Sequence, residues 1–172
     1  MAQINERVTI CLNSQDRAEI NYLYREELEP QIKYLQARDT FTHTYTPKAS
    51  FTGLVAEYAF AKWFGCDYVI KPYDPTNDDV LGYQIKATER YDGCLIKQPH
   101  NPSGIYFLGI FLNDYSEVSF RGWKDSSEIQ RACYWRADVP KPGYFVPQAA
   151  LWPLSDLPET TELFTHRTTG LW

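Results

Sequence analysis

The sequence lacks the features that mark several large classes of protein. Its four cysteines, Cys11, Cys66, Cys94 and Cys133, form no C-x-x-C pair and no cysteine–histidine spacing typical of a zinc site. No apolar run approaches the roughly 18 residues that a membrane-spanning helix requires. A Gly-rich phosphate loop and a serine-nucleophile motif are also missing. We therefore expect a soluble, cytoplasmic protein with reduced cysteines and no membrane partner.

The chain also lacks an excess of positive charge. It has 17 basic and 22 acidic residues and a net charge of -5, which argues against broad, nonspecific adhesion to nucleic acid. Any polyanion would have to meet a local basic patch or a metal ion that supplies positive charge. The length of 172 residues suits a single domain, 1–172, with a substantial core.

Hydrophobic periodicity predicts helices first and strands afterwards. Residues 14–37 have apolar positions at helical spacing, and Pro30 should break or kink this helix. A second helix is expected at about 50–64, closed by Gly65. The later segments expected are strands at 66–71, 80–88, 105–111 and 117–123, a short helix at 124–133, and an extended Pro-rich tail. This order predicts an α/β domain with one central mixed β-sheet flanked by helices.

The stretch DDVLGYQIKAT, residues 78–88, concentrates the polar residues of interest. In a strand, Gln84 and Lys86 project to one face, whereas Ile85 and Ala87 project into the core. Gly82 would allow a tight turn that brings Asp79 beside the Gln84 and Lys86 pair. A carboxylate, an amide oxygen and an ammonium group would then converge.

A second carboxylate is available on the helix before these strands. In GLVAEYAFAKWF, Glu57 is the one acid on an apolar helix, and Gly53 lies one turn earlier on the same face. An acid in that position is costly unless it is paired or binds a metal. Carboxylate and amide oxygens suit Mg²⁺, which can polarise a phosphoryl oxygen and lower the pKa of a bound water.

These residues resemble the PD-(D/E)xK nuclease superfamily. The matching motifs are G-x-x-x-E ending at Glu57 and D-x-x-G-x-Q-x-K from Asp79 through Gln84 to Lys86, and the resemblance covers about 50–135. It implies a restriction-endonuclease-like core, with a helical N-terminal extension at 1–49 and an extended tail at 136–172. Gln84 departs from the family's usual Glu or Asp, which removes one negative charge from the site.

The resemblance implies a metal-dependent nuclease that hydrolyses DNA, with RNA as a further substrate and a homodimer for double-strand cutting. Mg²⁺, or Mn²⁺ in its place, would be held by Glu57, Asp79, Gln84 and the Ile85 carbonyl, and Lys86 would position the attacking water. A small nuclease of this kind fits a phage or mobile-element setting. Basic residues flanking these motifs in sequence could grip backbone phosphates. They are Lys48, Arg90, Lys97 and Arg121.

Other interpretations stay open from sequence. Gln84 and Lys86 could form an ordinary solvent-exposed strand face, and Glu57 could pair with Lys62 or Lys86. Asp78, rather than Asp79, could be the ligand, and either aspartate could cap the local turn. Asp78 or Glu89 could also compensate for Gln84. The alternative function is a nuclease-like protein without catalysis that acts as a nucleic-acid-binding module or an inhibitor.

Overall fold

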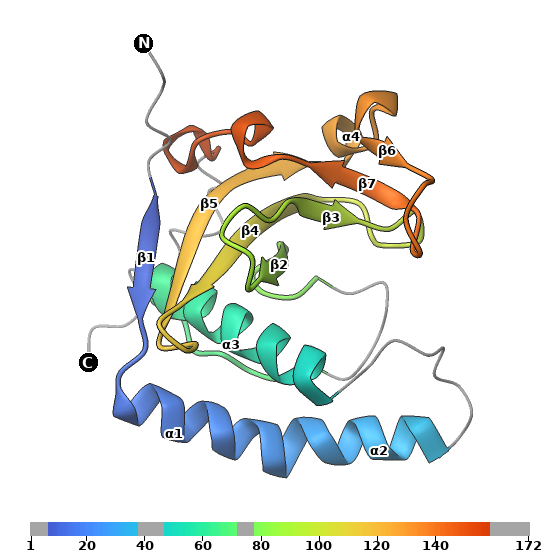
Figure 1. The fold of residues 1–172 in the computed structure, drawn as a ribbon. Helices are drawn as coiled ribbons and strands as arrows, with labels where there is room; N and C mark the ends of the chain where they lie inside the picture. Colours follow the sequence, from blue (N-terminus) through green and yellow to red (C-terminus); the bar gives the residue numbers. More distant parts are fainter. Residues whose placement is uncertain (1–6, 38–46, 72–77, 159–172) are drawn as a thin grey trace.

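A four-stranded mixed sheet is the centre of the fold. The computed structural model describes residues 7–37, 47–71 and 78–158. The strand order is β1-β5-β4-β2, in which β2 and β4 are parallel and the other neighbours are antiparallel. The strands are β1 (Val8–Cys11), β2 (Gln84–Thr88), β4 (Ile105–Leu112) and β5 (Glu117–Asp125). Figure 1 shows this sheet between two further layers.

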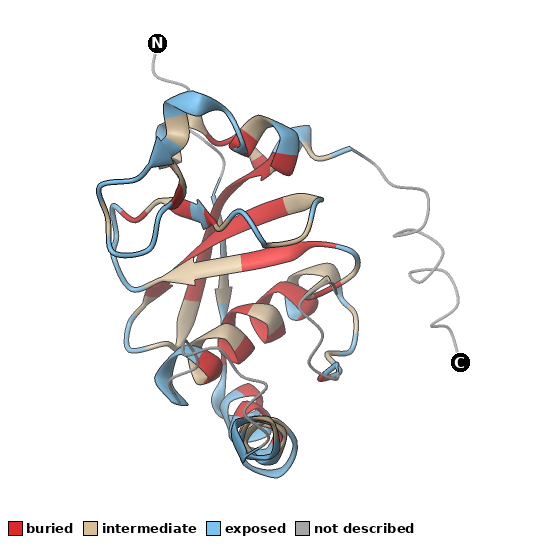
Figure 2. Cartoon of the chain, turned by 90° about the vertical axis from the view of Figure 1, so that its right-hand side faces the viewer, coloured by how far each residue is buried: buried red, intermediate tan, exposed pale blue. Residues whose placement is uncertain are grey.

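Helices cover one face of the sheet. The helix α3 (Pro47–Phe64) packs against it, and a long helix formed by α1 (Ser14–Leu23), the π-helical turn η1 (Tyr24–Leu28) and α2 (Glu29–Ala37) lies outside α3 (Figure 1). Because α3 is covered on two sides, it is apolar around most of its circumference. Phe60, in its C-terminal half, contacts the rings of Phe107 and Phe120 in the sheet. Figure 2 shows the buried residues gathered along α3 and the middle of the sheet.

A second, smaller sheet covers the opposite face. It consists of β3 (Leu95–Lys97), β7 (Gly143–Val146) and β6 (Trp135–Arg136), in the order β3-β7-β6. The short helices α4 (Ser126–Ile129), η2 (Ala132–Tyr134), η3 (Gln148–Ala150) and η4 (Leu154–Asp156) complete this layer. The parallel strands β2 and β4 are therefore connected through β3. The usual connection between parallel strands is a helix.

The predicted mixed α/β fold with a central mixed sheet flanked by helices is confirmed. The helix predicted at 50–64 is also correct, although it begins at Pro47; Gly65 ends it with a φ of 67°. Pro30 does not break the first helix. The distortion lies just before it, in the π-helical turn, where the wider backbone spacing accommodates the missing N–H and the proline ring.

The strand predictions are partly correct. β4 and β5 lie where strands were expected at 105–111 and 117–123. The strand expected at 66–71 does not form, because the backbone of this segment pairs with no strand of the described chain, although its side chains alternate. Within 80–88 only Gln84–Thr88 is a strand, since the preceding four residues form a turn. The helix expected at 124–133 is reduced to α4 and η2. The strands belong to two sheets, and β1 was not anticipated.

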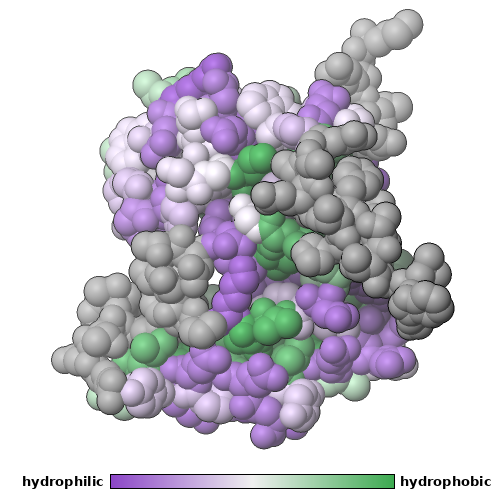
Figure 3. Space-filling model, turned by 180° about the vertical axis from the view of Figure 1, so that it is seen from behind, coloured by the Kyte–Doolittle hydropathy of each residue, from purple (hydrophilic) through white to green (hydrophobic). Residues whose placement is uncertain are grey.

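The surface of the described residues carries separate apolar areas. Figure 3 shows hydrophobic patches interrupted by hydrophilic side chains on the face seen from behind. Isolated exposed apolar residues of this kind are common on globular proteins. Within the part of the chain that the structure describes, no helix combines the length and apolar character needed to cross a bilayer.

Candidate functional site

A two-residue hairpin turn brings Asp79 beside β2. Val80 and Tyr83 exchange backbone hydrogen bonds of 3.2 and 2.9 Å around Leu81 and Gly82, which both have positive φ values, 52° and 83°. This is the turn type whose twist matches paired strands. Gly82 adopts the left-handed conformation at no steric cost, as the sequence predicted, and the Asp79 N–H donates to the Tyr83 carbonyl at 2.9 Å.

Substitution of Gly82 provides a test of this turn. We expect Gly82→Ala to lower the free energy of unfolding by about 1 kcal/mol, because a Cβ is strained at this φ although it would meet no neighbouring atom. Gly53→Ala is the matched control: Gly53 is helical, and an added Cβ would meet only Glu57 Oε1 at 4.0 Å. That control should raise stability by roughly 0.5–1 kcal/mol. Urea denaturation measures both, and equal effects would contradict the role of the turn.

The Asp79 carboxylate connects the turn to the strand. Its Oδ2 accepts a hydrogen bond from the Ile85 N–H at 2.6 Å and lies 3.5 Å from Lys86 Nζ. Both side chains are mostly buried, at 20% exposed for Asp79 and 33% for Lys86. Screening by water is therefore weaker here than at the open surface. The expected convergence of the aspartate and the lysine is present in the structure.

Glu57 reaches the same region from α3. Its Oε2 accepts a 2.7 Å hydrogen bond from the Tyr68 hydroxyl. Burial and the nearby negative charge of Asp79 raise the pKa of Glu57 to about 7, although the Tyr68 hydrogen bond, Lys86 and Lys71 act in the opposite direction. Two carboxylates thus repel each other in a poorly hydrated position, which is the electrostatic condition that a bound cation relieves.

The oxygen atoms available at this site suit Mg²⁺ better than a metal ion that takes all of its ligands from protein side chains. Oε1 of Glu57 and Oδ1 of Asp79 accept no hydrogen bond from the described residues, so each carboxylate has one oxygen available. No group of three or more His, Cys, Asp or Glu side chains is assembled among residues 7–37, 47–71 and 78–158. Mg²⁺ is commonly held by one or two carboxylates and keeps several waters.

Gln84 and Ile85 occupy opposite faces of β2. Ile85 and Ala87 pack with the core below α3, as predicted. Gln84 projects to the same face of β2 as Lys86, and it pairs with Tyr106 of β4 in the strand register. Gln84 is only 4% exposed, so it is not part of an ordinary solvated strand face. Lys86 Nζ lies 6.0 Å from the centre of the Tyr106 ring.

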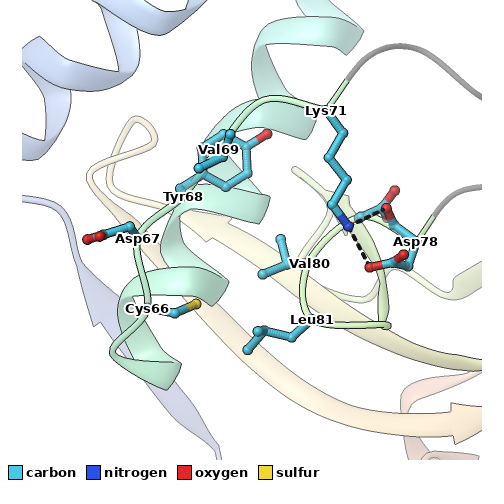
Figure 4. A pocket seen from close by; sticks show the side chains of 9 residues that line it. Cys66, Asp67, Tyr68, Val69, Lys71, Asp78, Val80 and Leu81 are labelled. Carbon is cyan, nitrogen blue, oxygen red and sulfur yellow. Dashed lines mark hydrogen bonds and ion pairs between the residues drawn. The ribbon is translucent and has the colours of Figure 1, made fainter. Parts of the chain in front are cut away.

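A pocket with a volume of about 350 Å³ opens beside Asp79. Figure 4 shows its two walls: the extended segment from Cys66 to Lys71 and the turn that carries Val80 and Leu81. Tyr68, which binds Glu57, belongs to the first wall. Asp79 and Tyr68 therefore line a space that a small ligand group could enter, whereas Glu57 is not among the lining residues.

Asp78 and Glu89 have other partners. Asp78 Oδ2 accepts from Lys71 Nζ at 2.6 Å and from the Gly82 N–H at 2.7 Å, so it stabilises the turn, as one of the sequence interpretations held. Partial burial opposes but does not outweigh these bonds, which lower the pKa of Asp78. Glu89 pairs with Lys48 at 2.7 Å on the surface.

The sequence left open an ion pair of Glu57 with Lys62 or Lys86, and neither forms among the described residues, where Lys86 pairs with Asp79. Lys62 instead binds Asp16 at 2.5 Å.

The four basic residues expected to grip phosphates have different environments. Lys48 and Arg90 are exposed and pair with Glu89 and Asp92. Lys97 is 1% exposed, and its Nζ donates to the carbonyls of Gln98 and Asn101 at 3.3 and 3.0 Å. Lys97 therefore presents no charge at the surface. Arg121, at 3% exposed, is also inside the protein.

Sequence reasoning missed two residues that surround the carboxylates. Tyr68 holds Glu57, and Lys71 binds Asp78 and contributes positive charge near Glu57. Burial and the adjacent Glu57 raise the pKa of the Tyr68 hydroxyl, so it remains a neutral donor. The available signal was the alternation of Tyr68 and Ile70 in CDYVIK, which shows that this segment faces the core.

No family model, no curated protein and no solved structure matches the chain.

Proposed function

We propose that the protein is a Mg²⁺-dependent nuclease of the PD-(D/E)xK type that hydrolyses phosphodiester bonds of DNA. The observation that carries this proposal is the juxtaposition of two carboxylates with a lysine, from three separate segments: Glu57 on α3, Asp79 before the turn, and Lys86 on β2. A structural ion pair alone does not require a second carboxylate, Glu57, whose pKa is raised by burial and by the charge of Asp79. A site for a cation and a phosphate explains both the repulsion and the lysine.

The residues present fit a magnesium ion. Glu57 and Asp79 would hold it through the oxygens that no described residue binds, and the Ile85 carbonyl and the Gln84 amide oxygen would complete the protein ligands. Mg²⁺ bound there would supply a water of lowered pKa and would neutralise charge that develops on the phosphoryl oxygens. Only two negative charges face the ion, since Gln84 contributes none.

The chain's own residues have distinct tasks in this proposal. Lys86 would orient the attacking water and stabilise the phosphate charge, because its ammonium is already anchored by Asp79. Tyr68 fixes Glu57 through Oε2 and so leaves Oε1 for the ion. The Ile85 N–H fixes Asp79 in the same way. These contacts place both carboxylates before any ligand binds, which reduces reorganisation.

A second function is favoured by Gln84. Because the site has lost one carboxylate and Gln84 is buried, the protein could keep the fold and the nucleic-acid contacts without cleaving. In that case it would act as a binding module or an inhibitor. Cleavage assays separate the two functions.

We expect wild-type protein with Mg²⁺ or Mn²⁺ to cleave at least one of single-stranded, double-stranded, nicked or branched DNA, and EDTA to stop the reaction. Asp79→Asn should lose cleavage by at least about 10²-fold, because a metal-binding charge is removed. Asp92→Asn is the matched control, since Asp92 is an exposed aspartate paired with Arg90, and it should cut like wild type. Wild-type protein that leaves every DNA and RNA form intact would favour the binding function.

A further inference from the structure

Arg121 is a buried cation that the proposed nuclease site does not use. It is 3% exposed, and its Nε and Nη1 atoms are fully buried with no hydrogen-bond partner in the described part of the chain. Removing a guanidinium from water without acceptors is costly, so native structures usually give such a group a carboxylate, a carbonyl or an anion. The structure shows no ion pair of Arg121 among the described residues.

A β-bulge places Arg121 on the sheet face opposite α3. The β4 to β5 register shifts so that Leu108 pairs with Gly122 and Gly109 with Phe120, which leaves Arg121 as the extra residue. Phe120 belongs to the core below α3, whereas Arg121 contacts Tyr91, whose carbonyl accepts from Gln148 of η3 in the layer that covers the opposite face. Bulges commonly redirect a side chain towards a functional site.

A second arginine and a tyrosine meet Arg121 on this face. The Arg121 guanidinium lies 4.8 Å from the centre of the Tyr91 ring, and Arg7 Nη1 donates to the Tyr91 hydroxyl at 3.1 Å. Hydrogen bonds from Arg7 and Arg121 lower the pKa of that hydroxyl, as expected for a phenol beside two cations. Like Arg121, Arg7 has no carboxylate within ion-pair distance in the described residues. We call Arg7, Tyr91 and Arg121 the arginine–tyrosine site.

The surroundings of this site are ordered and polar. Gln148 Nε2 donates to the carbonyls of Tyr91 and Gly93 at 2.7 and 3.1 Å, which holds the turn that carries Tyr91. Thr9 and Ser119, two residues along β1 and β5 from the arginines, share a 3.2 Å hydroxyl hydrogen bond. Tyr91 is 62% exposed and lies over the guanidinium of Arg121, so a ligand that reaches Arg121 would have to displace the Tyr91 ring.

We infer that the arginine–tyrosine site binds a phosphate group, and specifically a second phosphate of the nucleic-acid strand that is cut at Glu57, Asp79 and Lys86. The identity of the strand rests on the proposed function, whereas the affinity for phosphate does not. Guanidinium groups match phosphate oxygens with paired hydrogen bonds, and the Tyr91 oxygen now occupies the position of one such acceptor.

The two sites belong to the same sheet, with β4 between the strand of Lys86 and that of Arg121. In the register, Lys86 lies opposite Leu108, and Leu108 lies opposite Gly122, the neighbour of Arg121. Leu108 is buried beneath the second sheet, in one cluster with Leu95 and Val146, so a nucleic-acid strand that reaches both sites would pass around this sheet and not straight across β4.

Thermal unfolding in inorganic phosphate tests the site without metal or cleavage. At matched ionic strength, phosphate at ten times its dissociation constant should raise the melting temperature of wild-type and Asp79→Asn protein by about 3–6 °C relative to chloride. Arg121→Met should lose this shift, and Arg136→Gln should keep it, since Arg136 is an exposed arginine paired with Asp138. Tyr91→Phe removes only the competing hydroxyl, so it should bind phosphate at least as tightly as wild type.

Fluorescence anisotropy with a single-stranded oligonucleotide in EDTA tests the strand assignment. Arg121→Met and the exposed Arg7→Ala should each weaken binding about tenfold, and Arg136→Gln should not. No phosphate-specific shift in wild type, or an equal shift in Arg121→Met and Arg7→Ala, would overturn the site. A phosphate shift with unchanged oligonucleotide affinity would overturn its assignment to the strand. Failure of DNA cleavage alone leaves both readouts intact and refutes only the nuclease function.

Discussion

Replacing Lys86 by methionine is expected to reduce DNA cleavage on the order of 10²–10⁴-fold while the protein still binds Mg²⁺. Methionine keeps an unbranched apolar chain but removes the ammonium that lies 3.5 Å from Asp79. Because Lys86 is one of the groups that lower the pKa of Glu57, its removal should raise that pKa further, so Mg²⁺ binding is compared well above pH 7. There Glu57 is ionised and no ammonium competes with the divalent ion, so the affinity for Mg²⁺ should be equal or higher. Lys86→Met should therefore lose cleavage and keep metal binding. Asp79→Asn, in contrast, should lose both cleavage and metal binding.

Initial cleavage rates and Mg²⁺-dependent melting shifts measure these two quantities in the same preparation. Lys33→Met is the matched control, because Lys33 is an exposed lysine paired with Glu29 on the outer helix, and it should change neither. A Lys86→Met protein that cuts at the wild-type rate would remove the lysine from the mechanism. If metal binding disappeared as well, Lys86 would be needed for the architecture of the site.

Replacing Glu57 by glutamine is expected to flatten the pH dependence of stability in metal-free protein. The pKa of Glu57 is raised from 4.5 to about 7, chiefly by burial, so the folded protein keeps a proton that the unfolded chain releases above pH 4.5. Because the folded state binds more protons, the free energy of unfolding falls as pH rises from about 4.5 to about 7. The total loss is at most about 3 kcal/mol.

Urea denaturation between pH 4.5 and 8 in EDTA measures this effect. Glu57→Gln should match wild type near pH 4.5 and exceed its stability at pH 8, and Mg²⁺ should stabilise wild type more strongly as pH rises. Glu19→Gln is the control, because Glu19 also accepts a 2.7 Å hydrogen bond from a tyrosine hydroxyl but is exposed. A wild-type stability that rises with pH, or one identical to that of Glu57→Gln, would contradict the raised pKa.

The local geometry around Asp79 was predictable because it depends on short-range rules. The period of two in a strand separates Lys86 from Ile85, and Gly82 permits the turn that returns Asp79 to the strand. The end of α3 at Gly65 follows from the same kind of rule. The contribution of Glu57 required packing of α3 on the sheet, which the family resemblance suggested and the sequence pattern alone did not.

Other features depend on contacts that sequence patterns do not encode. The segment from Cys66 to Lys71 alternates like a strand, yet what it contributes is the Tyr68 hydrogen bond to Glu57. β1 has four residues and pairs with β5 more than 100 positions later, so its register could not be read locally. Lys97 resembled a surface cation, but its ammonium binds carbonyls inside the protein. Arg121 is buried because of a bulge set by the β4 pairing.

A structure determined with Mn²⁺ tests the central claim most directly. Anomalous scattering at the manganese edge locates the ion without assumptions about its ligands. The proposed nuclease site predicts one peak between the carboxylates of Glu57 and Asp79, within coordination distance of the Ile85 carbonyl, and no peak in Asp79→Asn crystals. A fully occupied manganese ion at another position would contradict the proposed metal site. So would the absence of a peak at saturating Mn²⁺ above pH 7.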